Sequence, residues 1–528
     1  MKRIVLHLCL YGCLFSVSSV RAQSVTWSEH VAPIVYNHCT TCHRPGEIAP
    51  FSLTNYDEAY NWANMMRYVT EIRYMPPWKA DPKFDVEYLG ENYLTDDEIA
   101  TIKAWVDGGA PQGDPALEPP LPVFPSGSQV GTPDLILSFT QSYVHKGTGV
   151  DEYRYFVLPT GLTQNKNLVA LEMRPGNTKI VHHALFWADT SGVAASLDAQ
   201  TPEYGFVGGQ GQGGGQANFG PQLPTYVPGA KPNVYTHGMA QRVFAGSDLV
   251  MQVHYAPTPV DETDSSTINL FFSNQPVSRF VNSYIMLPPS LVNGPFVMEP
   301  NTVREFHGVF KTPLAVSLLG VMPHCHLLGK NWRVFAVTPQ KDTISLIHIE
   351  NWDFNWQGTY HFRKLKVLPK NSEIHAFATY DNTSDNPFNP NFPPQTVTWG
   401  EGTADEMYYL PLLWLPYQTG DENIDLGGGT TGVDDVRFHF NQTRLYPVAP
   451  NPARGVVKLG YTLAETGPVS LEVFDPKGHT VASLQPGRLT MAGEHILNWD
   501  TAPLAPGLYF ITLRTNATVQ TQKVLVAP

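Results

Sequence analysis

Cysteine is scarce in this chain, and its scarcity excludes a fold braced by several disulfides. Five cysteines occur among 528 residues. Cys9 and Cys13 lie in the first 22 residues, and Cys39 and Cys42 form a single C-x-x-C motif. Cys325 is therefore left without an intramolecular partner. We expect it to be a buried thiol, with metal ligation as the less favoured alternative.

Long apolar runs and clusters of basic residues are also missing. A membrane-spanning helix needs about 20 predominantly apolar residues, and no such run follows the first 22 residues. The 34 Lys and Arg residues are outnumbered by 47 Asp and Glu residues and form no basic runs. Binding to nucleic acid depends on such clusters. The sequence therefore predicts neither a nucleic-acid partner nor a transmembrane segment.

Residues 1–22 have the features of a secretory signal peptide. They begin with basic residues, continue with a short apolar stretch and end with small residues, Val20 and Ala22, that fit cleavage before Gln23. The sequence thus predicts an exported, soluble mature protein.

The C-x-x-C motif is followed directly by a histidine. In Cys39-Thr40-Thr41-Cys42-His43 the two thiols can anchor a c-type haem while the histidine ligates its iron. A redox disulfide and half of a zinc site are the alternatives. The adjacent histidine and the absence of a second C-x-x-C motif argue against both. The motif predicts a covalent c-type haem.

Residues 23–116, which contain this motif, resemble a small class I cytochrome c domain. A helix is expected around residues 56–70. A second helix is expected from Thr95, where Glu98 completes a capping box, to Gly108. The resemblance implies a small α-helical domain around the haem.

The resemblance also implies a methionine as the sixth ligand of the haem iron. Met75 is the best candidate, because the following Pro76 and Pro77 hold it in a rigid M-P-P-W segment. Met65 and Met66 are competitors that we expect to lie in the core instead. A Met/His pair raises the potential of the haem and suits electron transfer rather than oxygen binding.

Six side chains that bind copper in proteins follow in a fixed order: His182, His183, His254, His324, His326 and Met407. Imidazole suits copper, zinc, iron and nickel, and a thioether shifts the preference toward copper. Each residue taken singly has a structural interpretation, because histidine is often a surface or satisfied core residue and methionine a common core filler. The ordered set favours two copper ions of unequal softness.

The spacing of these residues sets geometric conditions. Two residues apart on a strand, His324 and His326 would share one face while Cys325 points away. Adjacent residues such as His182 and His183 face opposite ways on a regular strand. Joint ligation of one ion by this pair therefore requires a local twist or a β-bulge.

The segments KIVHHALFW, LVMQVHY, HCHLLGK and DEMYY lie between residues 135 and 425. Their order resembles that of the copper type II, ascorbate-dependent monooxygenases, the family of peptidylglycine α-hydroxylating monooxygenase and dopamine β-hydroxylase. The resemblance implies that the first three histidines hold an electron-transfer copper. It implies that His324, His326 and Met407 hold the catalytic copper, where O2 is activated and a C–H bond is attacked. Ascorbate would be the reductant.

One position departs from the family pattern. The peptide-amidating enzyme has an arginine two residues before its H-x-H motif, where this chain has Met322. That arginine grips the carboxylate of the substrate, so a peptidylglycine substrate is not expected here. The substrate is left as an unknown small organic molecule.

The chain is too long for one core and should contain several domains. Alternating runs separated by turns predict two antiparallel β-sandwiches, over residues 134–276 and 277–420. A Pro-rich linker at 117–133 precedes them, and a Gly-rich linker at 421–440 follows. The glycine run GGQGQGGGQANFG marks an internal loop before His254.

Residues 441–528 resemble the C-terminal sorting domain of type IX secretion, a small immunoglobulin-like sandwich. PNPA, the W-D turn, L-x-x-G-x-Y and the final KVLV carry this resemblance. A carbohydrate-binding sandwich is the alternative, but no aromatic platform stands out. The resemblance implies export to the cell surface or into the medium, with the type IX machinery as a partner.

Together these features predict a multidomain, mainly β protein that acts as an exported haem- and copper-dependent oxidoreductase. We expect an O2-dependent monooxygenase that hydroxylates a C–H bond with electrons from ascorbate or from the fused cytochrome c. A non-catalytic electron-transfer or copper-binding surface protein is the first alternative. A surface binding module with structural metals is the second.

Overall fold

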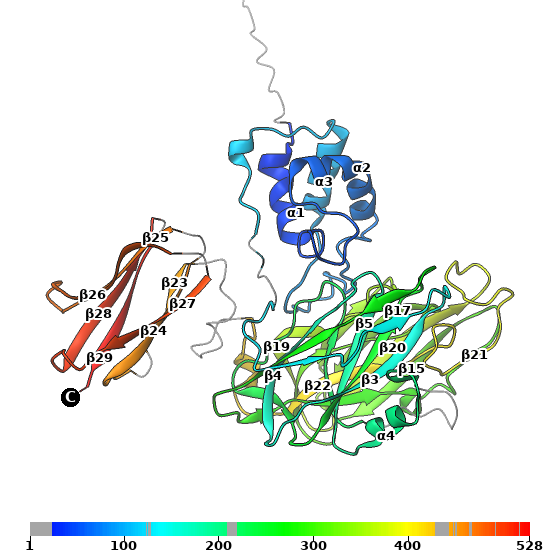
Figure 1. The fold of residues 1–528 in the computed structure, drawn as a ribbon. Helices are drawn as coiled ribbons and strands as arrows, with labels where there is room; N and C mark the ends of the chain where they lie inside the picture. The colour runs from blue at the N-terminus through cyan, green and yellow to red at the C-terminus, as the bar shows by residue number, and fades with distance from the viewer. Residues whose placement is uncertain are drawn as a thin grey trace, which may run out of the picture. The chain divides into compact units, whose positions relative to one another are not determined.

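The computed structural model describes residues 24–122, 124, 128–207 and 219–427, and from the last part of the chain residues 443–446, 448, 451–463, 467–490, 493–516 and 518–527. The predicted signal peptide, nearly all of the Gly-rich loop before His254 and most of the Gly-rich linker lie outside the described residues. The fold is mainly β, as predicted, with several sheets and a small helical part (Figure 1).

The chain divides into two compact units. Of the described residues, the first unit takes in 24–45, 49–76 and 94–121, and the second takes in 46–48, 77–93 and those from 122 onward. The N-terminal part of the chain is therefore not one continuous segment of a single unit.

The first unit is helical. After a π-helical turn at Trp27–Val31, its helices are α1 (Ala32–His38), α2 (Tyr56–Glu71) and α3 (Asp96–Asp107). The side chain of Thr95 accepts a hydrogen bond from the backbone N–H of Glu98, and the Glu98 carboxylate accepts one from the backbone N–H of Thr95. This capping box confirms the predicted start of α3. The helices enclose a core that includes Trp27 and Trp105.

Two five-stranded sheets form the first sheet pair of the second unit. One sheet has the order β1-β11-β4-β8-β12, with β1 Leu135–Ser138, β4 Lys166–Arg174, β8 Met239–Val243, β11 Thr267–Phe272 and β12 Arg279–Phe280. The other has the order β6-β3-β9-β5-β7, with β3 Glu152–Pro159, β5 Val181–Asp189, β6 Phe206–Val207, β7 Gln222–Tyr226 and β9 Asp248–Tyr255. Apolar side chains of both sheets meet in one core.

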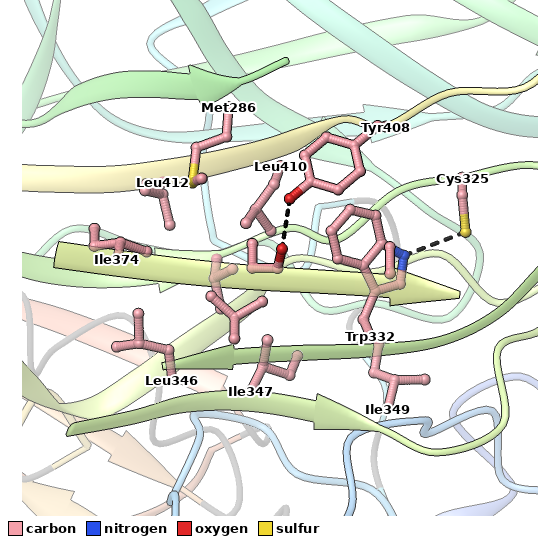
Figure 2. Close-up of a cluster of buried hydrophobic side chains, with 14 of the residues drawn as sticks. Met286, Cys325, Trp332, Leu346, Ile347, Ile349, Ile374, Tyr408, Leu410 and Leu412 are labelled. Atoms are coloured by element: carbon pink, nitrogen blue, oxygen red, sulfur yellow. Dashed lines mark hydrogen bonds between the residues drawn. The ribbon is translucent and has the colours of Figure 1, made fainter. Parts of the chain in front are cut away.

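Two four-stranded antiparallel sheets form the second sheet pair. One has the order β13-β22-β16-β19, with β13 Asn282–Met286, β16 Val316–Val321, β19 Tyr360–Leu368 and β22 Leu410–Pro416. The other has the order β15-β20-β17-β18, with β15 Thr302–Lys311, β17 Gly329–Val337, β18 Thr343–Ile349 and β20 Glu373–Asn382. Figure 2 shows part of the core between them, where Trp332 and Tyr408 lie among aliphatic side chains.

Residues 77–93 pack into the core of this second sheet pair, and we call them the strap. Val86 and Tyr88 are buried there. The Tyr88 hydroxyl donates to the carbonyl oxygen of Leu346 over 2.8 Å, and the backbone N–H of Leu89 donates to His361 over 2.7 Å. The predicted cytochrome c domain, residues 23–116, included the strap. The apolar side chains of the strap instead complete the core of the second sheet pair, so the extent of the predicted domain is corrected here.

The last part of the chain has its own core. Its sheets have the orders β23-β24-β27 and β26-β25-β28-β29, with β23 Arg444–Leu445, β24 Val456–Leu463, β25 Gly467–Phe474, β26 Thr480–Thr490, β27 Gly493–Asp500, β28 Gly507–Arg514 and β29 Val519–Val526. Leucine, valine and aromatic side chains from both sheets form its buried cluster.

Candidate metal centres

The C-x-x-C-H motif follows directly on α1 in the first unit. Cys39 is the C-cap of that helix, and the backbone N–H of His43 donates to the Cys39 carbonyl over 2.9 Å. Nδ1 of His43 lies 3.1 Å from the carbonyl oxygen of Phe51. A proton on Nδ1 satisfies that contact and leaves Nε2 available as a ligand. Neither cysteine is in a disulfide with another described residue, so the motif keeps the thiol groups that haem attachment requires.

The three methionines near α2 have different surroundings. Met75 follows the helix and is half-buried, with its backbone N–H donating to the Val69 carbonyl over 3.1 Å. Met66 packs in the core, as predicted. Met65 does not, because it lies on the outer face of α2 and is 49% exposed. Of the two competing candidates for the sixth ligand of the haem iron, Met66 therefore lies in the core and Met65 at the surface.

In the second unit, β5 and β9 bring three histidines together. His183 pairs in register with His254, and the register shifts between Val181 and His183. This irregularity is the bulge that the adjacent pair requires, and it turns His182 to the same side as its neighbour. The ligand atoms of all three histidines lie within 4.8 Å of one another.

The three Nδ1 atoms form a nearly equilateral triangle. The separations are 3.1 Å from His182 to His254, 3.2 Å from His182 to His183, and 3.4 Å from His183 to His254. Three nitrogens about 2.0 Å from one metal ion would be separated by about 3.3–3.5 Å. The triangle therefore fits a single transition-metal ion bound to three imidazoles.

Asp151 orients one corner of this triangle, a role that no motif in the sequence indicates. Its Oδ1 atom lies 2.5 Å from Nε2 of His254. A proton on Nε2 would be shared with the carboxylate, which leaves Nδ1 unprotonated and aimed into the triangle. Burial raises the pKa of Asp151, but the hydrogen bonds from His254 and Thr403 and the charges of His254 and His182 together outweigh it, so the pKa lies below its usual value. Tyr153 stacks on the His254 ring at a centroid distance of 4.3 Å.

His324 and His326 are buried but do not lie on a regular strand. β16 ends at Val321, and His324 makes an isolated bridge with Tyr409 before β17 begins at Gly329. The predicted strand is therefore wrong, because the chain here turns toward the Glu406 carboxylate instead of continuing the ladder. Nδ1 of His326 lies 3.0 Å from the Asp405 carbonyl, which leaves Nε2 free for a ligand role.

Cys325, between the two histidines, is buried as predicted. The indole Nε1–H of Trp332 lies 3.2 Å from its Sγ atom, a contact drawn in Figure 2. The thiol therefore points toward the core of the second sheet pair.

Met407 joins these two histidines around a common hollow. The hollow is also lined by His183 of the first set. The ring centroids of His183 and His324 are 6.3 Å apart. The two predicted ligand sets are thus neighbours, with the hollow on their shared side.

Glu406 ties the loop of His326 to Met407. This fully buried carboxylate accepts hydrogen bonds from the backbone N–H groups of His326 (2.8 Å), Leu328 (2.7 Å) and Met407 (3.1 Å). Burial raises its pKa to about 8, although the backbone donors act in the opposite direction. The position of Glu406 next to Met407 in the sequence does not by itself indicate that its carboxylate holds this loop.

A loop at residues 351–358 covers both ligand sets. The ring centroid of Phe354 lies 6.0 Å from those of His182 and His254 and 5.7 Å from that of His326. Lys79 of the strap forms an ion pair with Asp353 at 3.4 Å, beside this phenylalanine. The strap therefore contacts the loop at residues 351–358, which covers the histidine cluster of His182, His183, His254, His324 and His326.

Four of these histidines, His182, His183, His324 and His326, are poised to be neutral at pH 7. Burial, with smaller repulsion from neighbouring imidazoles, lowers the pKa of His182 to about 4 and that of His324 to about 3. Burial likewise lowers the pKa of His326 to about 4 and that of His183 well below its usual value. Unprotonated imidazole is the form that binds metals.

Comparisons with solved structures give only remote similarities. The chain is similar to β-glucuronidases of Parabacteroides merdae (11% identity, TM-score 0.12, covering 42% of this chain and 27% of that chain) and Lactobacillus rhamnosus (15%, 0.11, 43% and 36%). The VP2 subviral particle of infectious bursal disease virus is another (10%, 0.15, 55% and 75%). The chain thus spans about a third of the length of the glucuronidases, and these scores carry no functional argument. No curated protein matches.

A family model matches the end of the chain. Residues 447–527 match the secretion system C-terminal sorting domain. Among the described residues, no helix has the length and apolar character needed to cross a membrane. The chain therefore carries a type IX sorting domain, which makes the secretion machinery its partner and directs it to the cell surface or into the medium.

Proposed function

We propose that the chain is an exported haem- and copper-dependent monooxygenase that hydroxylates a C–H bond of a small organic substrate. The observation that carries the proposal is the histidine triangle, whose three Nδ1 atoms lie at metal-binding separations, beside a hollow lined by four of the six copper-type ligands. When bound, copper would supply oxygen activation and the covalent haem would supply single electrons.

The protein residues would divide the work. Following the resemblance, His182, His183 and His254 would hold the electron-transfer copper. The catalytic copper would be held by His324, His326 and Met407, whose thioether favours Cu(I).

The surrounding side chains would fix these ligands. Asp151 would hold the tautomer of His254, and Glu406 would hold His326 and Met407 at their positions. The apolar ring of Phe354 would keep water from the histidines. Hydroxylation converts R–H, O2, two electrons and two protons into R–OH and water, and ascorbate or the haem would deliver the electrons one at a time.

In the first unit, Cys39 and Cys42 would carry the haem through thioether bonds, and His43 and Met75 would ligate its iron. The hydrogen bond between His43 Nδ1 and the Phe51 carbonyl supports this role for His43, because it orients the ring and leaves Nε2 for the iron.

A non-catalytic copper-binding or electron-transfer protein is the second candidate. It is favoured by Met322, a buried apolar side chain in the wall of the hollow where the amidating enzyme has a substrate-binding arginine. Oxygen consumption that depends on an added substrate would separate the two candidates.

The first experiment is a metal and haem analysis of the protein matured with haem and copper. We expect two copper ions and one c-type haem per chain. His254→Ala and Met407→Ala should each lose or weaken one copper, whereas His479→Ala, at an exposed position in the sorting domain, should lose none. Stoichiometric zinc, or metal binding unaffected by the first two substitutions, would contradict the proposal.

A further inference from the structure

The hollow beside the ligand sets has a wall that is free of positive charge. The hollow is open on one side, and its space is about 430 Å³ when the adjoining solvent is included. Apart from the four metal-binding side chains, its lining residues are Tyr153, Leu185, Gln252, Met322, Glu401 and Tyr409. No lysine or arginine is among them, so an anionic substrate would find no counter-charge from the described lining.

The donors of this wall are already engaged. The Tyr409 hydroxyl donates to Gln222 over 3.1 Å. The Gln252 amide donates to the Tyr155 hydroxyl over 2.6 Å. Tyr155 in turn donates to the carboxylate of Glu401. Gln252, Tyr155 and Glu401 therefore form a short relay that ends on the Glu401 carboxylate.

Glu401 is an acceptor with spare capacity. A carboxylate offers about four lone-pair positions, and Tyr155 is its one hydrogen-bond donor among the described residues. The side chain is half-buried, and burial raises its pKa above the usual value. A partly desolvated carboxylate with an incomplete shell of donors is stabilised by a ligand that donates a hydrogen bond.

From this wall we infer that Glu401 is the specificity residue of the hollow, and that the substrate is a small molecule with an apolar body and a hydroxyl or ammonium donor. The body would lie against Leu185 and Met322, and the donor would bind Glu401. A carboxylate bound at Glu401 would face a like charge, and no lysine or arginine of the described lining would offset the repulsion. This inference rests on the proposed function, because it takes the hollow as the substrate site.

Direct binding tests the inference without requiring turnover. The probes are benzylamine, benzyl alcohol and benzoate, which share one ring and differ in the polar group. Dissociation constants would be measured by calorimetry with copper-loaded full-length protein. We expect at least one of the two donors to bind about 10-fold or more tighter than benzoate. Benzoate binding as tightly as both donors would overturn the inference.

Matched variants locate the effect. Glu401→Gln keeps a carbonyl acceptor but removes the charge, so benzylamine should weaken about 10-fold and benzyl alcohol less. Glu305→Gln makes the same chemical change at an exposed position of β15 and should alter neither. Unchanged affinities in Glu401→Gln would overturn the inference. If that variant does not fold, Glu401→Asp serves instead, with a smaller loss for both donors.

Measurements of oxygen consumption test the proposed function separately from this inference. Donor probes that bind through Glu401 without causing oxygen consumption would support the binding site for the donor group and count against monooxygenase activity. Oxygen consumption that depends on a carboxylate substrate would support the enzyme and overturn the subsite.

Discussion

Oδ1 of Asp151 lies 2.5 Å from Nε2 of His254, on the side of the imidazole that faces away from the histidine triangle. A contact of this kind fixes both the ring orientation and the tautomer of a metal-binding histidine. The two residues are far apart in sequence, and the pairing of β3, which starts just after Asp151, with β9 brings them together.

Replacing Asp151 with Asn should weaken metal binding without unfolding the protein. Loss of an outer partner of a histidine ligand typically lowers metal affinity about 10–100-fold. Competition titration with a copper chelator measures the change. Asp261→Asn, which alters an exposed ion pair with Lys146, is the matched control and should leave the affinity unchanged. Equal affinities for both variants would show that Asp151 does not orient a ligand.

Acidification should destabilise the metal-free protein in the range where free histidine titrates. Unfolded histidines have a pKa near 6.5, whereas burial lowers the pKa of folded His182 to about 4 and of His324 to about 3. The unfolded state therefore binds more protons below about pH 6.5, so stability falls with pH until the folded histidines also protonate. Urea unfolding between pH 7.5 and 5 measures the slope. His324→Asn should reduce it, and an unchanged slope would argue against these shifts.

Glu406→Gln should loosen the attachment of Met407. The substitution places an amide N–H₂ among three backbone N–H donors, so at least one donor loses its buried partner, at about 1–3 kcal/mol. We expect the copper–sulfur distance signal in X-ray absorption to weaken or disappear. Glu373→Gln, at the surface end of β20, should leave the signal intact.

Tyr88 should contribute to stability through both its hydroxyl and its ring. Tyr88→Phe removes the hydrogen bond to Leu346 and should lower the free energy of unfolding by about 0.5–1.5 kcal/mol. Tyr88→Ala also leaves a cavity in the core and should lower it by about 3–5 kcal/mol. Denaturant titrations compare both with Tyr417→Phe, whose hydroxyl is exposed and should matter little. A small effect of Tyr88→Ala would mean that the strap is not part of the folded core.

Met75→Ala should change the haem in a way that Met65→Ala does not. Loss of a thioether ligand lowers the reduction potential of a Met/His haem, whereas Met65 lies on the outer face of α2. Redox titration followed by visible absorption distinguishes the two. The opposite pattern would exchange the roles of the two methionines.

Local patterns in the sequence were sufficient for some parts of the protein. The capping box of α3 needs only Thr95 and Glu98, three residues apart, and the structure has it. The bulge at His182 followed from the alternation of side chains along a strand, given that both histidines bind one ion.

Other features depend on contacts between distant segments. The pairing of Asp151 with His254 spans 103 residues, and that of Glu406 with the His326 backbone spans 80. Residues 322–328 form a loop because the Glu406 carboxylate accepts hydrogen bonds from their backbone. These contacts override the strand preference of the preceding apolar run. No spacing rule brings such partners together, because the fold must first do so.

The strap sets a limit on how this chain can be divided. Residues 77–93 interrupt the sequence of the helical unit and supply Ala80, Val86 and Tyr88 to the core of the second sheet pair. Excising residues 24–121 as a block would remove that part of the core together with the C-x-x-C-H motif. The helical unit is therefore not an exchangeable cassette: a truncation or chimaera that is meant to isolate the histidine cluster must retain residues 77–93.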